Sequence, residues 1–332
     1  MIAPLAKFID WLSIQKNCRR APHCYGQTLR LEAIQFLIGP DFIPAESQPA
    51  RVEFNRDKPG LNFRFPTPRP SSFAENNVVH GRFYRGAGRW QERPAIILLH
   101  GGSVGRGRST SLGYRFLYPL IARRCNRAGF NAATLEAPYH FQRHPRQPGA
   151  MGQVDYMRMA EAAAQEVAEI RALTGWLLGE GCPAVALWGI SMGAWLAGMT
   201  VCRDARFAAA VMTLPPVRSN PSYADRIIWR SVRKAWQEVC AADEALDETP
   251  FNLTRARPAI PKENILLVEG TQDLVTPAEP IEELWQLWGK TGIWRLPHGH
   301  NSLSLCLTGL ISPILRWLEP RLDNATTQTL YK

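Results

Sequence analysis

Short apolar runs alternate with longer stretches of mixed polarity through the middle of the chain. The apolar runs lie at 95–100, 130–135, 184–189 and 207–213. The stretches with the length and apolar spacing of helices lie at 112–128, 154–179 and 191–202. Runs that are apolar at almost every position are typical of strands buried on both faces of a parallel sheet. The pattern therefore predicts an α/β fold with a doubly wound, mostly parallel sheet.

The pattern differs on either side of this region. Before it we expect two amphipathic segments, at 5–14 and 28–38, which pack on the sheet or form a lip over a functional site. We also expect two antiparallel edge strands, at 61–65 and 78–84. After it we expect two strands and a helix, at 264–270, 292–296 and 302–318. We therefore divide the chain into five parts. An N-terminal segment with helices and edge strands (1–94) is followed by the first part of the core (95–216) and a helical cap (217–262). The second part of the core (263–320) and a C-terminal tail (321–332) complete it.

Residues 217–262 interrupt the alternation of strands and helices. They carry helical sequence with aromatic residues, followed by an acidic stretch. We expect them to form a small lid. Trp229 and Trp236 lie seven positions apart, on nearly one face of a helix, where they either pack the lid onto the core or line a pocket.

The sequence Gly189-Ile190-Ser191-Met192-Gly193 joins a predicted strand to a predicted helix. In such a tight turn, glycines leave room that larger side chains would fill, and the serine hydroxyl stands above the sheet. A serine becomes nucleophilic when a base takes its proton and a carboxylate orients that base. Ser191 is therefore a candidate nucleophile.

Three more loops follow predicted strands and carry residues suited to this chemistry. The first predicted buried strand ends in His100-Gly101-Gly102, where backbone N–H groups can face an oxyanion. The next-to-last strand leads into Thr271-Gln272-Asp273, which places a carboxylate at a strand exit. The last strand leads into Pro297-His298-Gly299-His300, which supplies two imidazoles.

With these four motifs in this order, the chain is identified as a member of the α/β-hydrolase superfamily, of the serine esterase and lipase type, with matches from about Ala95 to Trp317. The run Leu135–Tyr139 before a basic loop, and the ending Gly299-His300, are similar to the abhydrolase domain-containing 18-like branch. Some members of that branch have been suspected of acting on lipids.

The superfamily pattern implies a role for each residue. Ser191 would be the nucleophile, Asp273 the orienting acid and His300 the general base. The backbone N–H groups of Gly102 and Met192 would form the oxyanion hole.

Alternatives stay open for the acid and the base. Glu269, at the end of the same strand, is the rival of Asp273, which also suits a helix cap or a turn. His298 is the rival of His300, which is favoured because a glycine directly before the catalytic histidine is common in the superfamily. The expected substrate-lining residues are His298, Tyr139 and Trp229. We expect His100 to form local hydrogen bonds, and the arginine-rich loop 138–146 to be a solvated rim.

A second pattern points to a different class of protein. The sequence from Gly102 to Ser109 fits a phosphate-binding G-x-x-x-x-G-K-S loop, except that Arg108 stands in place of the lysine. Arginine does not reproduce the compact charge that such a loop uses, and no strand-borne aspartate for Mg²⁺ follows at a suitable distance. We therefore favour the hydrolase over a nucleotide-hydrolysing protein.

The composition of the chain indicates which classes of partner to expect. With 332 residues, of which 45% are hydrophobic, the chain can bury one large core. A formal charge of +10 favours anionic surfaces, which predicts weak peripheral association with an anionic membrane. The basic residues are spread along the chain without a nucleic-acid-binding motif, so we expect no nucleic-acid partner.

Seven cysteines at irregular spacings predict no disulfide framework and indicate a reducing compartment. We recognise neither a secretory signal nor an apolar run long enough to span a bilayer, and expect a cytoplasmic protein. The histidines and cysteines do not form a ligand pattern, so we expect no metal and no cofactor.

The sequence thus predicts a serine hydrolase that cleaves a carboxylic ester of lipid-like or small-molecule character. An acyltransferase or a thioesterase with the same triad is the nearest alternative. A non-catalytic binding protein on the same fold is the alternative from another class.

Overall fold

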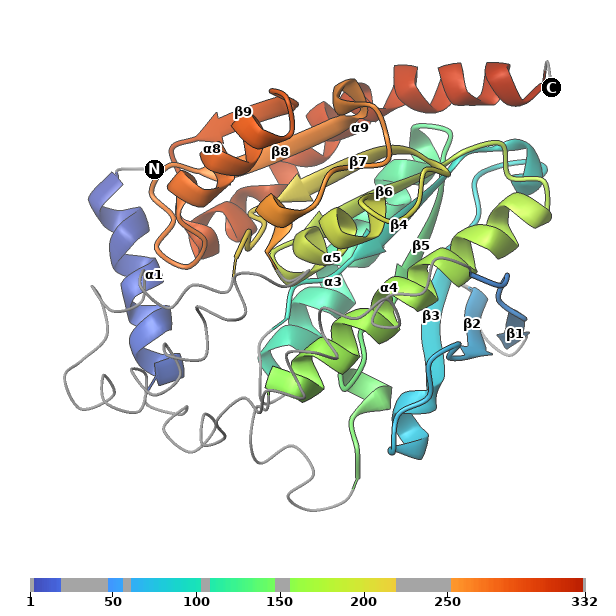
Figure 1. Cartoon of the computed structure of the whole chain (residues 1–332), viewed down its shortest axis with the longest axis horizontal. Helices are drawn as coiled ribbons and strands as arrows, with labels where there is room; N and C mark the ends of the chain where they lie inside the picture. The colour runs from blue at the N-terminus through green and yellow to red at the C-terminus, as the bar shows by residue number, and fades with distance from the viewer. Residues whose placement is uncertain are drawn as a thin grey trace.

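The computed structural model describes residues 3–18, 47–55, 61–102, 108–146, 156–218 and 252–330. Within these ranges, nine strands form one sheet in the order β1-β2-β3-β5-β4-β6-β7-β8-β9 (Figure 1). The strands are β1 (Glu53–Asn55), β2 (Leu61–Pro66), β3 (Val78–Tyr84), β4 (Ala95–Leu99), β5 (Asn131–Leu135), β6 (Val185–Ile190), β7 (Phe207–Thr213), β8 (Ile265–Gly270) and β9 (Gly292–Leu296). The α-helices are α1 (Ala3–Cys18), α3 (Arg108–Arg127), α4 (Tyr156–Gly179), α5 (Met192–Val201), α8 (Ala278–Leu287) and α9 (His300–Leu330). Short 3₁₀ turns are η1 (Ala74–Asn77), η2 (Trp90–Glu92), η3 (Phe141–Arg143), η4 (Leu253–Arg255) and η5 (Lys262–Asn264).

The sheet is parallel over most of its width. Neighbouring strands from β5 to β9 pair in parallel, while β1, β2 and β3 join one another and β5 in antiparallel pairs. The carboxyl ends of the parallel strands lie at one edge, so the loops that leave them are brought together. The predicted fold class, a doubly wound and mostly parallel α/β sheet, is confirmed.

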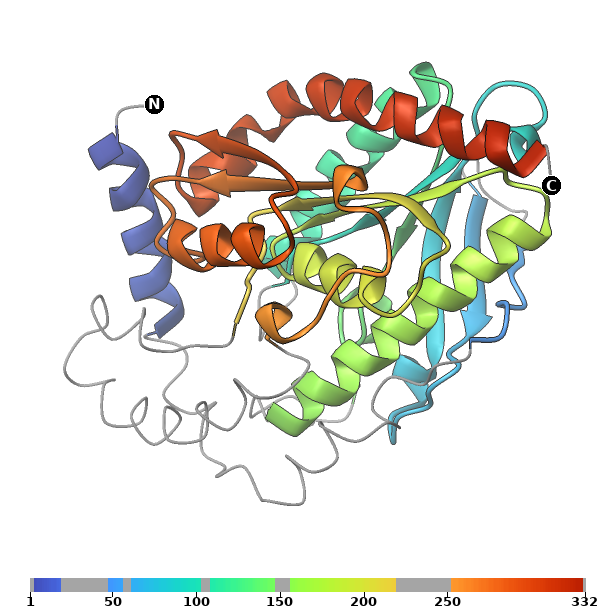
Figure 2. The same cartoon turned by 45° about the horizontal axis from the view of Figure 1, so that its top comes forward.

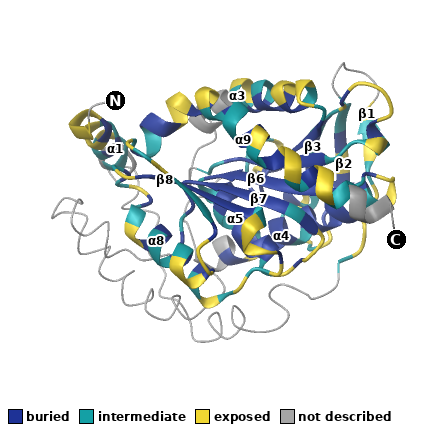
Figure 3. Cartoon of the chain, turned by 90° about the horizontal axis from the view of Figure 1, so that it is seen from above, coloured by how far each residue is buried: buried dark blue, intermediate teal, exposed yellow. Residues whose placement is uncertain are grey.

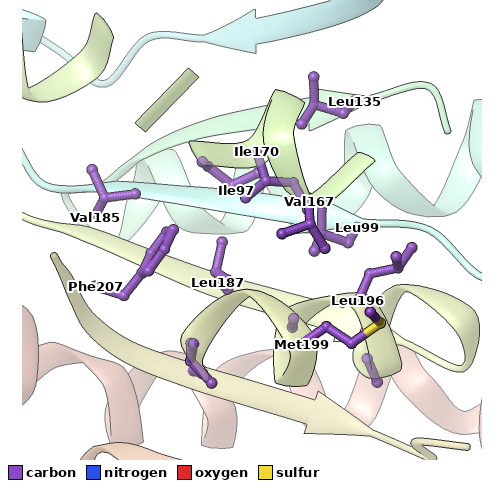
Figure 4. Close-up of a cluster of buried hydrophobic side chains, with 14 of the residues drawn as sticks. Ile97, Leu99, Leu135, Val167, Ile170, Val185, Leu187, Leu196, Met199 and Phe207 are labelled. Atoms are coloured by element: carbon purple, nitrogen blue, oxygen red, sulfur yellow. The ribbon is translucent and has the colours of Figure 1, made fainter. Parts of the chain in front are cut away.

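Helices cover both faces of the sheet (Figures 2 and 3). Helices α4, α5 and α8 pack on one face, where Ile97 of β4, Leu187 of β6 and Val167 of α4 belong to one buried apolar cluster (Figure 4). Helices α3 and α9 pack on the other face, where Ile96 and Trp188 from the same two strands are buried. Because successive side chains of a strand point to opposite faces, each central strand serves both cores and is held rigidly.

Every predicted strand is present, with each end within one residue of its predicted position. Strand β1 and helix α8 were not predicted. The last helix is longer than expected: it begins at His300 and continues to Leu330. It continues because its apolar face does, at Leu318 and Leu322, which are both fully buried. The segment predicted as a tail from residue 321 is, up to Leu330, part of this helix.

Most of the predicted lid lies outside the described residues. These ranges omit 219–251, and with them Trp229, as well as the predicted segment 28–38. The described ends of the lid segment pack onto the core, because Val217, Leu253 and Ile260 are buried in the cluster beneath α5 and α8. The segment predicted at 5–14 lies within α1.

Candidate active site

Ser191 alone makes the turn from strand β6 to helix α5. Its φ of 52° and ψ of −120° are values that residues with side chains rarely adopt, so its backbone is strained. The N–H of Ser191 donates to the carbonyl of Thr213 on β7 (2.8 Å), which holds the turn against the neighbouring strand. Strain that the surroundings hold in place marks functional positions, and here it falls on the predicted nucleophile.

The two glycines of the turn are required by close backbone packing. A Cβ at Gly189 would lie 2.1 Å from the carbonyl oxygen of Gly193. A Cβ at Gly193 would lie 2.3 Å from the carbonyl oxygen of Leu99. The first helical turn can therefore sit against the end of β4 because glycine occupies both positions.

His300 connects Ser191 to Asp273. Its Nε2 atom lies 3.0 Å from the Ser191 hydroxyl oxygen, and its Nδ1 atom lies 2.8 Å from Oδ2 of Asp273. A carboxylate accepts hydrogen bonds, so Nδ1 carries the proton that it donates to Asp273. In the neutral imidazole, Nε2 is then the acceptor for the Ser191 hydroxyl. The geometry is that of a nucleophile, a base and an orienting acid.

Asp273 is fixed by its own loop. Its Oδ1 atom accepts hydrogen bonds from the N–H groups of Val275 and Thr276, both at 2.7 Å. Its Oδ2 atom accepts the Thr276 hydroxyl at 2.8 Å. The turn-forming interpretation of Asp273 is therefore compatible with its contact to His300, because Oδ1 contacts only the turn, whereas Oδ2 contacts both the turn and the imidazole.

The surroundings of His300 change its acidity. Burial of the imidazole favours its neutral form, but the charge and hydrogen bond of Asp273 and the charge of Asp10 outweigh this effect. Together they raise the pKa of His300 above its ordinary value. A raised pKa makes the imidazole a stronger proton acceptor once it is neutral.

The rival acid and base lie elsewhere. Glu269 is buried and faces Arg295 at 3.7 Å, and burial together with the charge of Glu282 raises the pKa of Glu269 to about 7. His298 contributes its backbone carbonyl to the N–H of Gln272 (3.0 Å), and its Nδ1 has no hydrogen-bond partner within the described residues. The structure thus brings His300 to Ser191, and not His298.

The glycine loop after β4 lies against the turn at Ser191. A Cβ at Gly101 would lie 3.4 Å from Cβ of Ser191, and a Cβ at Gly102 would lie 2.4 Å from the sulfur of Met192. Met192 is the first residue of α5, and the N–H groups of a first helical turn have no carbonyl partner within the helix. Gly102 therefore packs against the Met192 side chain, next to the turn that carries Ser191.

Two histidines line the same loop without reaching Ser191. His100 accepts the Ala137 N–H at Nε2 (3.0 Å), so its Nδ1 is protonated and donates to the Gly101 carbonyl (2.9 Å). Burial lowers the pKa of His100 to about 3, which makes it a neutral, locally bonded residue as expected. His140 bonds the Pro138 carbonyl through Nδ1 (2.9 Å), and a Cβ at Gly102 would lie 3.5 Å from its Nε2.

The loop 138–146 is not the solvated rim that we predicted. Arg143 is fully buried and forms a bidentate ion pair with Glu169 of α4, at 2.6 and 2.7 Å. It also donates to the carbonyls of Glu136 (2.8 Å) and Asn76 (2.7 Å). The prediction was wrong because the partner carboxylate lies on a separate helix, which the local run of arginines does not reveal.

Tyr139, an expected substrate-lining residue, is buried in this loop. Its ring packs edge-on against Phe73 at 6.0 Å between centroids, and its N–H donates to Oδ1 of Asn76 (2.9 Å). Its φ of 64° shows that the chain turns sharply here. Tyr139 therefore shapes the loop that carries His140 toward Gly102.

Sequence reasoning missed Asp10. This aspartate of α1 is fully buried and accepts the backbone N–H of His300 at 2.7 Å. The local signal was a single acid between Phe8-Ile9 and Trp11-Leu12, in a helix whose other buried residue nearby is Ala6. A buried carboxylate needs hydrogen-bond donors around it, so an acid within an apolar helical segment is a candidate for such contacts.

Among the described residues, no group of three or more His, Cys, Asp and Glu side chains is arranged to hold a metal ion. None of the described helices combines the length and apolar character needed to cross a bilayer.

Comparison with known proteins identifies similar sequences. A family described as "Alpha/beta hydrolase domain containing 18" matches residues 88–257, about half of the chain. This range includes Ser191 and Gly102, whereas Asp273 and His300 follow it. The uncharacterized protein Rv2627c of Mycobacterium tuberculosis strain H37Rv is 25% identical over 263 residues, which cover 76% of this chain. The aligned region spans 59% of the length of that relative.

Solved structures share the fold at low sequence identity. The Pyrococcus furiosus esterase Pf2001 has a TM-score of 0.53 and 14% identity, and the match covers 83% of this chain and 100% of that chain. The acetyl xylan esterase from Paenibacillus sp. R4 has a TM-score of 0.58 and 14% identity, covering 92% of this chain and 98% of that one. Acetyl xylan esterase 1 from Thermoanaerobacterium sp. JW/SL YS485 has a TM-score of 0.52 and 14% identity, covering 88% and 98%.

Proposed function

Because this chain belongs to the alpha/beta hydrolase domain containing 18 family, we propose that it is a serine hydrolase that cleaves a carboxylic ester through Ser191, His300 and Asp273. The observation that carries the proposal is the continuous hydrogen-bonded row of these side chains, 3.0 Å from Ser191 to His300 and 2.8 Å from His300 to Asp273. The strained backbone of Ser191 supports it further.

In the first half of the reaction, the Ser191 oxygen attacks the ester carbonyl while its proton passes to Nε2 of His300. Asp273 stabilises the imidazolium that results. The carbonyl oxygen becomes an oxyanion, which accepts hydrogen bonds from the N–H groups of Gly102 and Met192. When the tetrahedral intermediate collapses, the imidazolium returns the proton to the departing alcohol, and an acyl-enzyme remains.

In the second half, water takes the place of the alcohol. His300 removes a proton from the water as it attacks the acyl-enzyme, and the proton then passes to Ser191 as the carboxylic acid leaves. His300 must be neutral at the start of both halves. Because its pKa is raised, the rate rises with pH through that raised pKa and is lost as the imidazole becomes protonated at lower pH.

We propose acyl esters of small-molecule or lipid-like character as the substrates. The esterases among the similar structures support an ester as the substrate class. The formal charge of +10 supports attraction of the enzyme to anionic lipid surfaces, where esters of this kind are presented.

The proposal is tested with a fluorophosphonate probe and intact-mass analysis. We expect one covalent adduct on the wild-type protein and none on Ser191→Ala, because the probe reacts with activated serines. Thr308→Ala removes an exposed hydroxyl from α9 and is the matched control, which should be labelled like the wild type. A folded wild-type protein that forms no adduct would contradict the proposal.

A further inference from the structure

Helix α1 packs against helix α9 (Figures 1 and 2), and the Asp10 carboxylate of α1 accepts the N–H of His300 at the start of α9. Ala6 and Asp10 lie one turn apart on α1, and both are fully buried, whereas Leu5, Phe8 and Leu12 are exposed. A helix of this kind would ordinarily bury its apolar side chains. A buried carboxylate is costly unless hydrogen bonds compensate for the lost water, so its contacts here require an explanation.

Both oxygens of Asp10 are fully engaged. Oδ2 accepts the N–H of His300 at 2.7 Å and the N–H of Leu274 at 3.2 Å. Oδ1 accepts the N–H and the side-chain amide of Asn301, at 2.9 and 3.0 Å. Leu274 directly follows Asp273 in the chain. One oxygen of Asp10 therefore ties the loop of the proposed acid to the proposed base.

The place of Asp10 follows from the way α9 begins. His300 and Asn301 are the first residues of α9, and the N–H groups of a first turn lack partners within their own helix. The positive end of the helix dipole also favours a negative charge at this point. Gly299, just before the helix, has no side chain that could supply a hydrogen-bond acceptor or a negative charge. Asp10 supplies the acceptor and the charge from α1.

Gly299 makes this approach possible. A Cβ on Gly299 would lie 2.5 Å from Oδ2 of Asp10 and 3.1 Å from the carbonyl oxygen of Ala6. The glycine directly before His300 is therefore the surface on which α1 docks. The two residues act as a matched pair, in which the missing side chain of one leaves room for the carboxylate of the other.

We propose that Asp10 is a positioning residue for His300, which holds the backbone of the base and of the acid loop in one arrangement and adds a second negative charge near the imidazole. This inference rests on the proposed roles of Ser191, His300 and Asp273. The pKa of His300 supports it: burial opposes the charged form, and the charges that raise the pKa come from Asp273 and from Asp10. Within the described residues, these two carboxylates, one on the loop after β8 and one on α1, are the charged groups that raise the pKa of the imidazole.

The decisive variant is Asp10→Asn, which keeps the shape of the side chain but removes the charge and turns an amide N–H₂ group toward N–H donors. We expect two results. The ¹⁵N titration of the His300 imidazole, assigned with His300→Gln, moves to lower pH than in the wild type. The second-order rate of fluorophosphonate labelling at neutral pH falls roughly 10- to 100-fold, because a small displacement of a base has an effect of this size.

Asp204→Asn is the matched control. Asp204 is also a buried carboxylate with several donors, from Arg171 and Arg206, but it precedes β7, at the end of the sheet opposite Ser191. We expect this variant to lower the thermal midpoint without changing the His300 titration or the labelling rate of the folded protein. If Asp204→Asn lowers the pKa of His300 and the labelling rate to the same extent as Asp10→Asn, the role of Asp10 is structural only, and the inference is wrong.

A second variant covers the case in which Asp10→Asn does not fold. Asp10→Glu keeps the charge but lengthens the side chain, so we expect the His300 titration to stay close to that of the wild type while the labelling rate falls. Full labelling rate in Asp10→Glu would overturn the positioning role. The two measurements also separate the two proposals. Absence of labelling in the wild type contradicts the proposed hydrolase function. An unchanged His300 titration in folded Asp10→Asn contradicts the proposed role of Asp10.

Discussion

At the scale of single residues, the site depends on where side chains are absent as much as on where they are present. Gly189 and Gly193 let α5 begin directly above the end of β4, and Gly299 lets Asp10 reach the backbone of His300. Each of these glycines faces a backbone or carboxylate oxygen at a distance that a Cβ could not share. The position of Ser191 and His300 is therefore set by steric exclusion in the surrounding turns.

Gly193→Ala tests this view. The added Cβ would meet the Leu99 carbonyl oxygen at 2.3 Å, and backbone atoms cannot move aside as a flexible side chain can. We expect the free energy of unfolding to fall by about 1–3 kcal/mol. We also expect fluorophosphonate labelling of Ser191 to be reduced at least about 10-fold.

Gly309→Ala is the control for that substitution. Gly309 lies inside α9, and no atom of the described residues outside its own stretch of helix lies within 4 Å of an added Cβ. Alanine should therefore raise the free energy of unfolding by about 0.5–1 kcal/mol, because glycine is a poor helix former, and should leave labelling unchanged. Urea unfolding of both variants measures the difference. Equal stability in the two would show that the close approach at Gly193 is unimportant.

At the scale of elements, the helices and strands that could be predicted from the sequence are those with a continuous apolar pattern along the chain. The buried strands were found because a strand covered on both faces is apolar at almost every position, as in β4 and β7. Helix α8 was missed because it has ten residues and follows the loop of Asp273, so its periodicity is short. The contacts of Asp10 with His300 join positions 290 apart, and no local pattern carries that information.

The bidentate pair of Arg143 and Glu169 joins the loop after β5 to helix α4 and gives a prediction about elements. Arg143→Met would leave Glu169 buried without its partner, next to Glu166, whose pKa burial already raises to about 8. We expect a loss of about 3–5 kcal/mol in the free energy of unfolding, because a buried charge without a partner is strongly destabilising. Replacing both residues, as Arg143→Met with Glu169→Leu, should recover much of this loss.

Arg64→Ala, on β2 in the antiparallel part of the sheet, is the matched control. Arg64 pairs with Glu53 at 3.1 Å, but both side chains are about two thirds exposed, so water screens the pair. We expect a change below about 1 kcal/mol. Chemical unfolding of the three variants gives the comparison. A cost for Arg143→Met no greater than that for Arg64→Ala would mean that the buried pair does not hold the loop.

At the scale of the whole molecule, charge and exposed apolar surface point to the same kind of partner. The chain carries a formal charge of +10, and α1 exposes Leu5, Phe8 and Leu12 on the helix that also supports His300 through Asp10. Figure 3 shows α1 at one end of the molecule with its outer face exposed. An apolar helical face on a basic protein can enter the interface of an anionic lipid layer.

We therefore predict peripheral binding to anionic vesicles. In co-sedimentation, the protein should bind vesicles of phosphatidylcholine with phosphatidylserine, and not vesicles of phosphatidylcholine alone. Added salt should weaken the binding, because charge steers the association. A variant with Leu5, Phe8 and Leu12 all changed to Ser should bind several-fold less while keeping the +10 charge, which separates apolar insertion from electrostatic attraction. Equal binding by this variant would assign the attraction to charge alone and exclude α1 as the contact, and equal binding to both vesicles would contradict the prediction altogether.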